Sequence, residues 1–322
     1  MGSISSFFKL IRYKHLLVYA LCLILIRTNI IDIFYAQQGL QSTIPMHSYI
    51  LWVLSFIVAL AACYIVNDYN DQEIDDFNRL DKNIFVGNTI KPRTAKRSFF
   101  ILIALSFVLG IVSQMGFSGV FRGGFSIYIY LILMFYSVKI KRVFLLKNIL
   151  IALIPIFFLF AATYTEYNIL QRTDMLAGLK DYIHIASIVV IWLALFMFLV
   201  SFIREVVKDM QDRVGDEKFG VHTLIVKCGE KKTKQIVYVL TGLLMACVLA
   251  FQIIYCQISP MSFIGGVTIL VQIPLIYFLV EFKKASIVQD YGFLADLLDM
   301  IFISILFVTF FASKIIVCGT VI

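Results

Sequence analysis

The sequence predicts an all-α, polytopic membrane protein with nine transmembrane helices arranged around a cytoplasm-facing cavity. Hydrophobic residues make up 61% of the 322 residues and charged residues only 15%, which lies outside the range of soluble domains. The apolar residues occur in long runs, and about 20 apolar residues in a helix cross roughly 30 Å of hydrocarbon. Lysines and arginines concentrate in every second gap between these runs, which is the pattern of a multi-pass topology.

Nine runs are long and apolar enough to be spans, although eight or ten spans are compatible with the same pattern. The weakest are the first run, which contains Arg27 and Asp32, and the fourth, which has Arg122 near one end. The nine predicted spans are 16–36, 48–66, 98–116, 119–138, 149–165, 182–203, 235–256, 261–280 and 292–313.

The distribution of basic residues supports a count of nine. With a cytoplasmic N-terminus, 23 of the 28 lysines and arginines fall before the first span or in the even-numbered gaps. The preference of basic residues for the cytoplasmic side then places the N-terminus and the polar segments 67–97 and 204–234 in the cytoplasm. The same rule places the C-terminus on the opposite side.

The formal net charge of +8 follows from these basic segments, which we interpret as orientation signals and contacts with anionic lipid. No nucleic-acid partner and no protein partner are predicted. The first apolar run leads into Arg27 without a small-residue cleavage site, which favours an uncleaved span over a signal peptide. The six cysteines show no metal-binding spacing. We expect one membrane domain over residues 1–322 and no soluble domain.

Two of the predicted cytoplasmic segments carry acidic clusters with the same spacing. These clusters are Asp68, Asp71 and Asp75 after the second span, and Asp209, Asp212 and Asp216 after the sixth. The spacing i, i+3, i+7 places three carboxylates on one face of a helix that continues out of its span. Its recurrence after four spans suggests an internal structural repeat.

Three like charges on one helix face repel one another, so a bound cation explains the arrangement best. Oxygen ligands select hard divalent ions, and one or two carboxylates with phosphate oxygens are the usual ligands of Mg²⁺. Two such faces opposed across a bundle would hold two or more Mg²⁺ ions with a diphosphate between them, with Asn67 and Glu205 as additional oxygen ligands. The alternative is a pair of solvated surfaces, which the repeated spacing and the low total of 20 acidic residues disfavour.

Both clusters match known motifs. Residues 64–75 contain the pattern NDxxDxxxD and residues 209–216 the pattern DxxDxxGD, and together they resemble the motifs of the UbiA superfamily of intramembrane prenyltransferases. The likeness runs through nearly the whole chain, and Tyr136-Ser137 followed by Lys141 and Asn148 is similar to the YSxxxK stretch of that family. The resemblance implies Mg²⁺ as cofactor and these metal ligands: Asn67, Asp68, Asp71, Asp75, Asp209, Asp212 and Asp216.

Segment 204–229 resembles the branch of this family that transfers a geranylgeranyl group to geranylgeranylglyceryl phosphate. The sequence departs from the family at Lys82-Asn83, where Arg-Pro is usual, and at Ile225, where Pro is usual. Lys82 keeps the positive charge that binds diphosphate. The acceptor stays open, because related sequences accept aromatic acids, quinone precursors, haem or chlorophyllide.

Such a transferase ionises an allylic diphosphate, and Mg²⁺ and cationic side chains stabilise the charge that develops on the leaving group. Lys141 is the first candidate for that cation, and Tyr136 is the second candidate catalytic residue. The carbocation needs a dry pocket, which Phe and Tyr side chains of the spans would supply. The candidate diphosphate ligands are basic side chains: Arg12, Arg79, Lys82, Lys141, Arg204 and Lys208.

We therefore expect Mg²⁺-dependent transfer of a long isoprenyl group from a prenyl diphosphate, with geranylgeranyl diphosphate as the first candidate, to a lipid acceptor. Prenylation of an aromatic quinone precursor is the main alternative. A cation-coupled transporter is a more distant one, because transporters place their acids near the midplane rather than at span ends. Three other features have simpler explanations. A favourable interaction with the helix dipole explains Asp296 and Asp299 equally well as acceptor binding does. Arg27 and Asp32 are explained by pairing with each other, and Gly265-Gly266 by close packing of helices.

Overall fold

The computed structural model describes residues 2–37, 39–42, 44–70, 90–113, 115, 143–172, 180–255 and 261–318, and these residues are helical with short turns and contain no strand. Eight helices within them are long and apolar enough to cross a membrane. They are Tyr13–Ala36, Met46–Asn70, Pro92–Val112, Leu146–Tyr164, Ala186–Gln211, Leu224–Tyr255, Phe263–Lys284 and Val288–Phe311. The all-α, polytopic membrane fold is thus confirmed. The remaining predicted span, 119–138, lies outside the described residues.

The chain forms two compact units and passes between them several times. The first unit comprises Met1–Leu21, Ile44–Lys147 and Val214–His222. The second comprises Cys22–Thr43, Asn148–Arg213 and Thr223–Ile322. The single domain expected over 1–322 stays a prediction.

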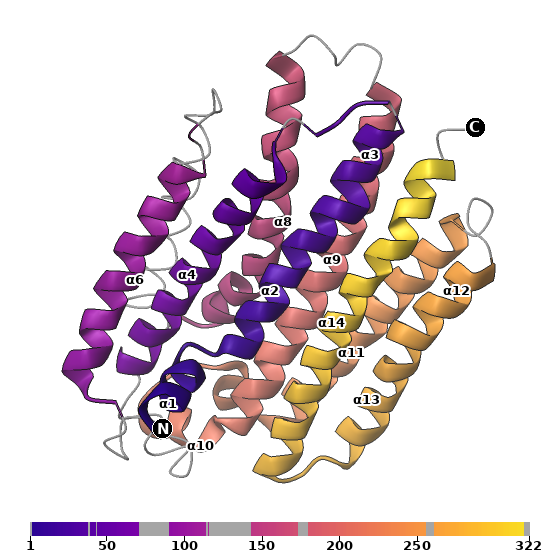
Figure 1. Ribbon diagram of the computed structural model, residues 1–322. Coiled ribbons are helices and arrows are strands. Elements are labelled where there is room, and N and C mark those ends of the chain that lie inside the picture. The colour runs from indigo at the N-terminus through magenta and orange to yellow at the C-terminus, as the bar shows by residue number, and fades with distance from the viewer. Residues whose placement is uncertain are drawn as a thin grey trace. The chain divides into compact units, whose positions relative to one another are not determined.

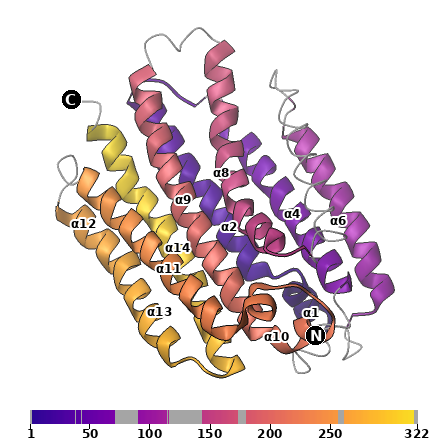
Figure 2. The ribbon, with the colours of Figure 1, turned by 180° about the vertical axis from the view of Figure 1, so that it is seen from behind.

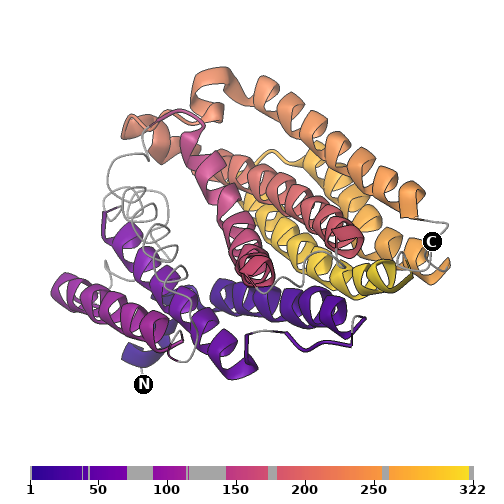
Figure 3. The ribbon, with the colours of Figure 1, turned by 90° about the horizontal axis from the view of Figure 1, so that it is seen from above.

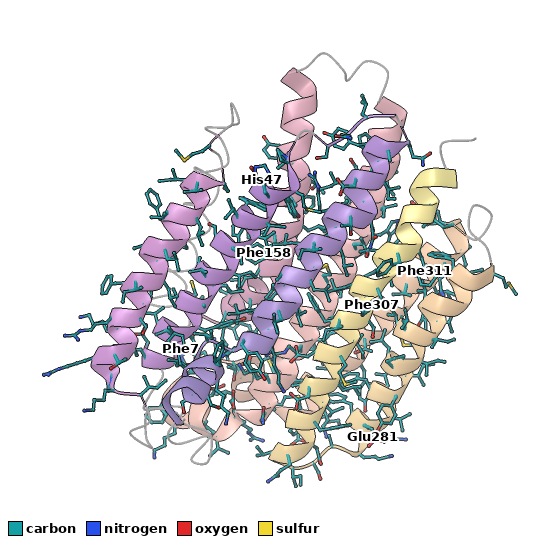
Figure 4. The ribbon with its side chains drawn as sticks, in the orientation of Figure 1. Phe7, His47, Phe158, Glu281, Phe307 and Phe311 are labelled. Carbon is teal, nitrogen blue, oxygen red and sulfur yellow. The ribbon has the colours of Figure 1, made fainter. Side chains whose placement is uncertain are left out.

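In the first unit, helix α4 (Met46–Asn70) lies side by side with α6 (Pro92–Val112), as Figure 1 shows. The contact is close, because a Cβ added at Gly110 of α6 would lie 3.2 Å from the Ser55 hydroxyl of α4. The short amphipathic helix α1 (Gly2–Leu10) also contacts α4, and Phe7, labelled in Figure 4, packs against their common core. That core consists of Leu10, Ala62, Ile65, Ile90, Ala95 and Phe99.

In the second unit, α9 (Lys180–Gln211) contacts both α11 (Leu224–Tyr255) and α14 (Val288–Cys318). Figure 2 shows α11 beside α9, and Figure 3 shows α14 on another side of α9. Aromatic rings join these helices. Phe251 of α11 lies 5.6 Å from the ring centre of Phe196 on α9 and 5.6 Å from that of Phe263 on α12 (Met261–Val267). Helix α8 (Leu146–Arg172) belongs to this unit from Asn148 onward.

Two π-helices interrupt the described spans of the second unit. The first, η1 (Arg27–Ile31), joins α2 (Tyr13–Ile26) to α3 (Asp32–Ala36), and Arg27 forms an ion pair with Asp32 at 2.9 Å, which confirms their predicted pairing. The second, η4 (Thr268–Gln272), joins α12 to α13 (Ile273–Lys284).

Gly266 lies against α14, as the sequence predicts for a site of close helix packing. A Cβ at Gly266 would clash with the ring of Phe311, whereas one at Gly265 would meet nothing within 4 Å. Figure 4 labels Phe311 at one end of this unit and Glu281 of α13 at the other. Close packing is therefore confirmed for Gly266 alone.

Segment 204–234 is largely helical, and the helix that carries Asp209 continues out of its span, as the spacing predicts. Helix α9 continues to Gln211, the short helix α10 (Arg213–Lys218) follows, and α11 begins at Leu224. Gly220 ends α10 with φ +67°, and Gly229 kinks α11 with φ +77°, both in the left-handed region that favours glycine. The predicted span 182–203 ends before α9 does, because a helix that leaves the membrane continues with a polar sequence.

Candidate active site

The first acidic cluster begins in the last turn of α4. Asn67 and Asp68 lie two to three residues before the helix ends at Asn70, and both side chains are partly buried. The other members of this cluster and several candidate partners lie outside the described residues: Asp71, Asp75, Arg79, Lys82, Tyr136 and Lys141.

Arg12 forms an ion pair with Asp68. The guanidinium Nη2 donates to Asp68 Oδ1 at 2.7 Å, and the guanidinium carbon lies 5.0 Å from the ring centre of Tyr64, one turn earlier on α4. Arg12 stands between α1 and α2 with φ +52°, a left-handed conformation that costs a non-glycine residue about 1 kcal/mol. The chain turn between these helices thus places a cation on the first acidic cluster.

The second acidic cluster begins in the last turn of α9 and extends into α10. Asp209 is buried on α9, Asp212 is partly buried in the bend after Gln211, and Asp216 is buried in the first turn of α10. The amide of Asp212 still donates to the carbonyl of Lys208 at 3.0 Å, so the helical path continues to that residue. The expected single helix face therefore holds for Asp209 and Asp212, and the bend moves Asp216 onto a separate helix.

Both clusters start at the C-terminal end of a long helix. That end carries the negative pole of the helix dipole, so a carboxylate there is disfavoured by about 0.3–1 kcal/mol. Asp68 and Asp209 therefore occupy electrostatically unfavourable positions, which a bound or neighbouring cation would relieve. The placement of both clusters at span ends, predicted from the sequence, is confirmed for these two residues.

Asn148, at the start of α8, contacts the second cluster directly. Its side-chain amide Nδ2 donates to Asp209 Oδ2 at 2.7 Å, and the two side chains are buried, with 2% and 1% of their surfaces exposed. The sequence groups Asn148 with Lys141 in one stretch, and nothing in that pattern indicates that its partner is Asp209.

Arg204 of α9 is held by two carboxylates. Its Nε and Nη2 donate to the two oxygens of Asp299 on α14 at 2.7 and 3.1 Å, and its Nη1 donates to Glu205. The donor nitrogens of the Arg204 guanidinium thus point to protein carboxylates, whereas the sequence predicts Arg204 as a diphosphate ligand. Lys208, also proposed as a diphosphate ligand, is partly buried one turn further along α9. The sequence does not indicate that Arg204 is the partner of Asp299, because the two residues lie 95 positions apart.

Asp299→Asn is expected to destabilise the protein by about 1–3 kcal/mol, because it removes a charged, bidentate hydrogen-bond partner of the partly buried Arg204. Thermal unfolding of the detergent-solubilised protein measures the loss. Asp296→Asn is the matched control, because Asp296 is exposed one turn earlier on α14. Equal unfolding temperatures for the two variants would contradict the structural role of the pair.

The donor chemistry of the clusters fits Mg²⁺. All the proposed ligands are carboxylate or amide oxygens, which hard divalent cations prefer. No three His, Cys, Asp or Glu side chains among the described residues are grouped so as to hold a metal ion without further ligands. Mg²⁺ commonly binds through one or two carboxylates together with phosphate oxygens of the substrate, so the described carboxylates suit a metal that arrives with a diphosphate.

A sequence profile of the UbiA prenyltransferase family matches residues 24–306. The chain belongs to this family. This UbiA-family protein is therefore a prenyltransferase and an integral, multi-pass membrane protein, as the sequence predicts. Family membership also decides against the transporter alternative.

Known relatives agree with this assignment. Digeranylgeranylglyceryl phosphate synthase of Sulfolobus acidocaldarius is 28% identical over 216 residues, which cover 66% of this chain and 70% of that protein. A solved structure of a digeranylgeranylglyceryl phosphate synthase superposes with a TM-score of 0.62 at 22% identity, covering 98% of this chain and 99% of that one. A UbiA homologue from Archaeoglobus fulgidus, solved with DMAPP and Mg²⁺, gives a TM-score of 0.57 at 15% identity, covering 95% and 99%. These structural similarities confirm the family fold.

Proposed function

We propose that this protein catalyses the Mg²⁺-dependent transfer of a geranylgeranyl group from geranylgeranyl diphosphate to geranylgeranylglyceryl phosphate, releasing diphosphate. The observation that carries the proposal is the pair of acidic clusters, each starting in the last turn of a membrane span of a UbiA-family chain. The similarity to digeranylgeranylglyceryl phosphate synthases supports the acceptor, and the Archaeoglobus fulgidus homologue with bound DMAPP and Mg²⁺ supports the donor class and the metal.

The proposed metal ligands are Asn67, Asp68, Asp71, Asp75, Asp209, Asp212 and Asp216. When bound, Mg²⁺ supplies positive charge that stabilises the departing diphosphate. Lys141 and Tyr136 remain the proposed catalytic residues, with Arg79, Lys82 and Lys208 as further diphosphate ligands. Apolar side chains of the spans exclude water, which would otherwise quench an allylic cation.

Arg12 has two roles in this proposal. While it pairs with Asp68 at 2.7 Å, its guanidinium lies beside a carboxylate that would hold the metal. A diphosphate bound to that metal would lie within reach of the same guanidinium, so Arg12 could bind both the carboxylate and the diphosphate. Arg204 is less available to the diphosphate as long as Asp299 holds two of its nitrogens. Of the two arginines, we therefore prefer Arg12 as a diphosphate ligand.

The cytoplasmic placement of the N-terminus and of both acidic segments, with the C-terminus on the opposite side, also belongs to the proposal. Single cysteines introduced into a variant without native cysteines test this topology. One replaces Lys218, which follows α9, and the other replaces Met261, at the start of α12. Both positions are exposed. A membrane-impermeant thiol reagent added to intact cells should label Met261→Cys but not Lys218→Cys. Labelling of both positions from one side would contradict the topology.

The acceptor preference tests the proposed function. Purified protein supplied with geranylgeranyl diphosphate and Mg²⁺ should prenylate geranylgeranylglyceryl phosphate at least about tenfold faster than 4-hydroxybenzoate or dihydroxynaphthoate, a difference of about 1.4 kcal/mol in barrier. Mass spectrometry of the products measures each rate. A preference for either aromatic acid would assign the protein to quinone synthesis, the alternative that the departures at Lys82-Asn83 and Ile225 leave open.

A further inference from the structure

Asn148 and Asp209 form a buried hydrogen bond between two helices of the second unit. Asn148 stands two residues after the start of α8 at Leu146, and Asp209 stands two residues before the end of α9 at Gln211. The Nδ2–Oδ2 distance is 2.7 Å, which is short for a bond from a neutral amide. With only 2% and 1% of the two residues exposed, water has little access to the bond.

The chemistry of the donor distinguishes this contact from those of Asp68 and Asp299, the carboxylates that pair with Arg12 and Arg204. Asp68 accepts from the cation Arg12, and Asp299 accepts from the cation Arg204. An arginine partner compensates the charge of a carboxylate, whereas an amide donor fixes its orientation and contributes no charge. The bond from Asn148 therefore orients the Asp209 carboxylate without itself adding positive charge.

We propose that Asn148 is a positioning residue for the metal, holding the Asp209 carboxylate in the orientation that coordinates Mg²⁺. This inference rests on the proposed function, in which Asp209 is a metal ligand. Residues that hydrogen-bond to metal ligands commonly change metal affinity by 10- to 100-fold when they are replaced. Burial strengthens the expectation, because no solvent molecule easily takes the place of the lost donor.

The test is the binding of Mn²⁺, measured by electron paramagnetic resonance with inorganic diphosphate and the full-length protein in detergent. Asn148→Leu, which removes the donor at similar volume, should raise the dissociation constant for Mn²⁺ at least about tenfold. Asn29→Leu is the matched control, because the Asn29 amide also bridges two helices of the second unit, donating to the Thr309 hydroxyl at 3.2 Å. The control should bind Mn²⁺ within about twofold of the wild type, as expected when no metal ligand is involved.

A double variant shows whether Asn148 acts through Asp209. Asp209→Asn weakens Mn²⁺ binding, and adding Asn148→Leu to it should cause less than about a twofold further change, because coupled residues are non-additive. If Asn148→Leu does not elute as a folded protein, Asn148→Ala removes the same donor without a branched side chain and carries the same expectation.

Three results would overturn the inference: wild-type affinity in the Asn148 variant, an equal loss in Asn29→Leu, or independent losses that multiply in the double variant. The first two would leave the hydrogen bond as a helix–helix contact only, visible as a lower unfolding temperature. A wild-type protein that binds no Mn²⁺ with diphosphate would instead refute the proposed function, and this inference with it.

Discussion

Asp212→Asn is expected to lower turnover at least about 100-fold, equivalent to about 2.7 kcal/mol of activation free energy. The substitution removes a proposed metal-binding charge with almost no change in side-chain volume. Because Asp212 is only partly buried in the bend after α9, the fold should survive, with an unchanged elution profile in detergent. Initial rates of prenyl transfer at saturating substrate measure the effect.

Asp68→Asn is expected to have an effect of the same size, for the same reason. Glu217→Gln is the matched control for both variants, because Glu217 is exposed and directly follows Asp216 in the sequence. It should retain wild-type turnover. If Glu217→Gln is as damaging as Asp212→Asn, acidic residues of this segment act through general surface charge, and the assigned metal ligands are wrong.

Removal of the metal is expected to abolish turnover completely. All the proposed ligands are oxygens, so excess EDTA should stop prenyl transfer, and added Mg²⁺ or Mn²⁺ should restore it. The expected loss exceeds that of any single substitution, because the diphosphate then departs without its principal charge stabilisation. The same assay with the protein returned to Mg²⁺ by dialysis controls for irreversible damage. Full turnover in excess EDTA would exclude the metal-dependent mechanism.

Most of the fold could be predicted because long apolar runs have few alternatives in a membrane. Eight of the nine predicted spans coincide with helices among the described residues, including the first, despite Arg27 and Asp32 within it. The π-helix η1 could not be predicted, because a one-residue change in helical pitch leaves no clear mark in hydropathy. Helix ends were less predictable, since α9 and α11 continue into polar sequence.

The residue types of the site could be predicted, but most of their contacts could not. Spacing along the chain identified Asp68 and Asp209, because i, i+3 and i+7 periodicity reflects the geometry of one helix. The pairs Arg12–Asp68, Asn148–Asp209 and Arg204–Asp299 join residues 56, 61 and 95 positions apart. Such contacts depend on how helices pack, which a single sequence does not encode as a local pattern. The Arg27–Asp32 pair was predictable because the two residues lie only five positions apart in the sequence.

The central claim is that the two acidic clusters act together on one diphosphate, and the Asp68→Asn/Asp212→Asn double variant tests it most directly. The effects of replacing groups that act as a unit do not add, so the turnover rate of the double variant should be within about threefold of that of the worse single variant. Initial rates of the four proteins, measured at equal concentrations of folded protein, complete the cycle. Losses that multiply to about 10⁴-fold would instead show that the clusters contribute independently, and would contradict a shared role.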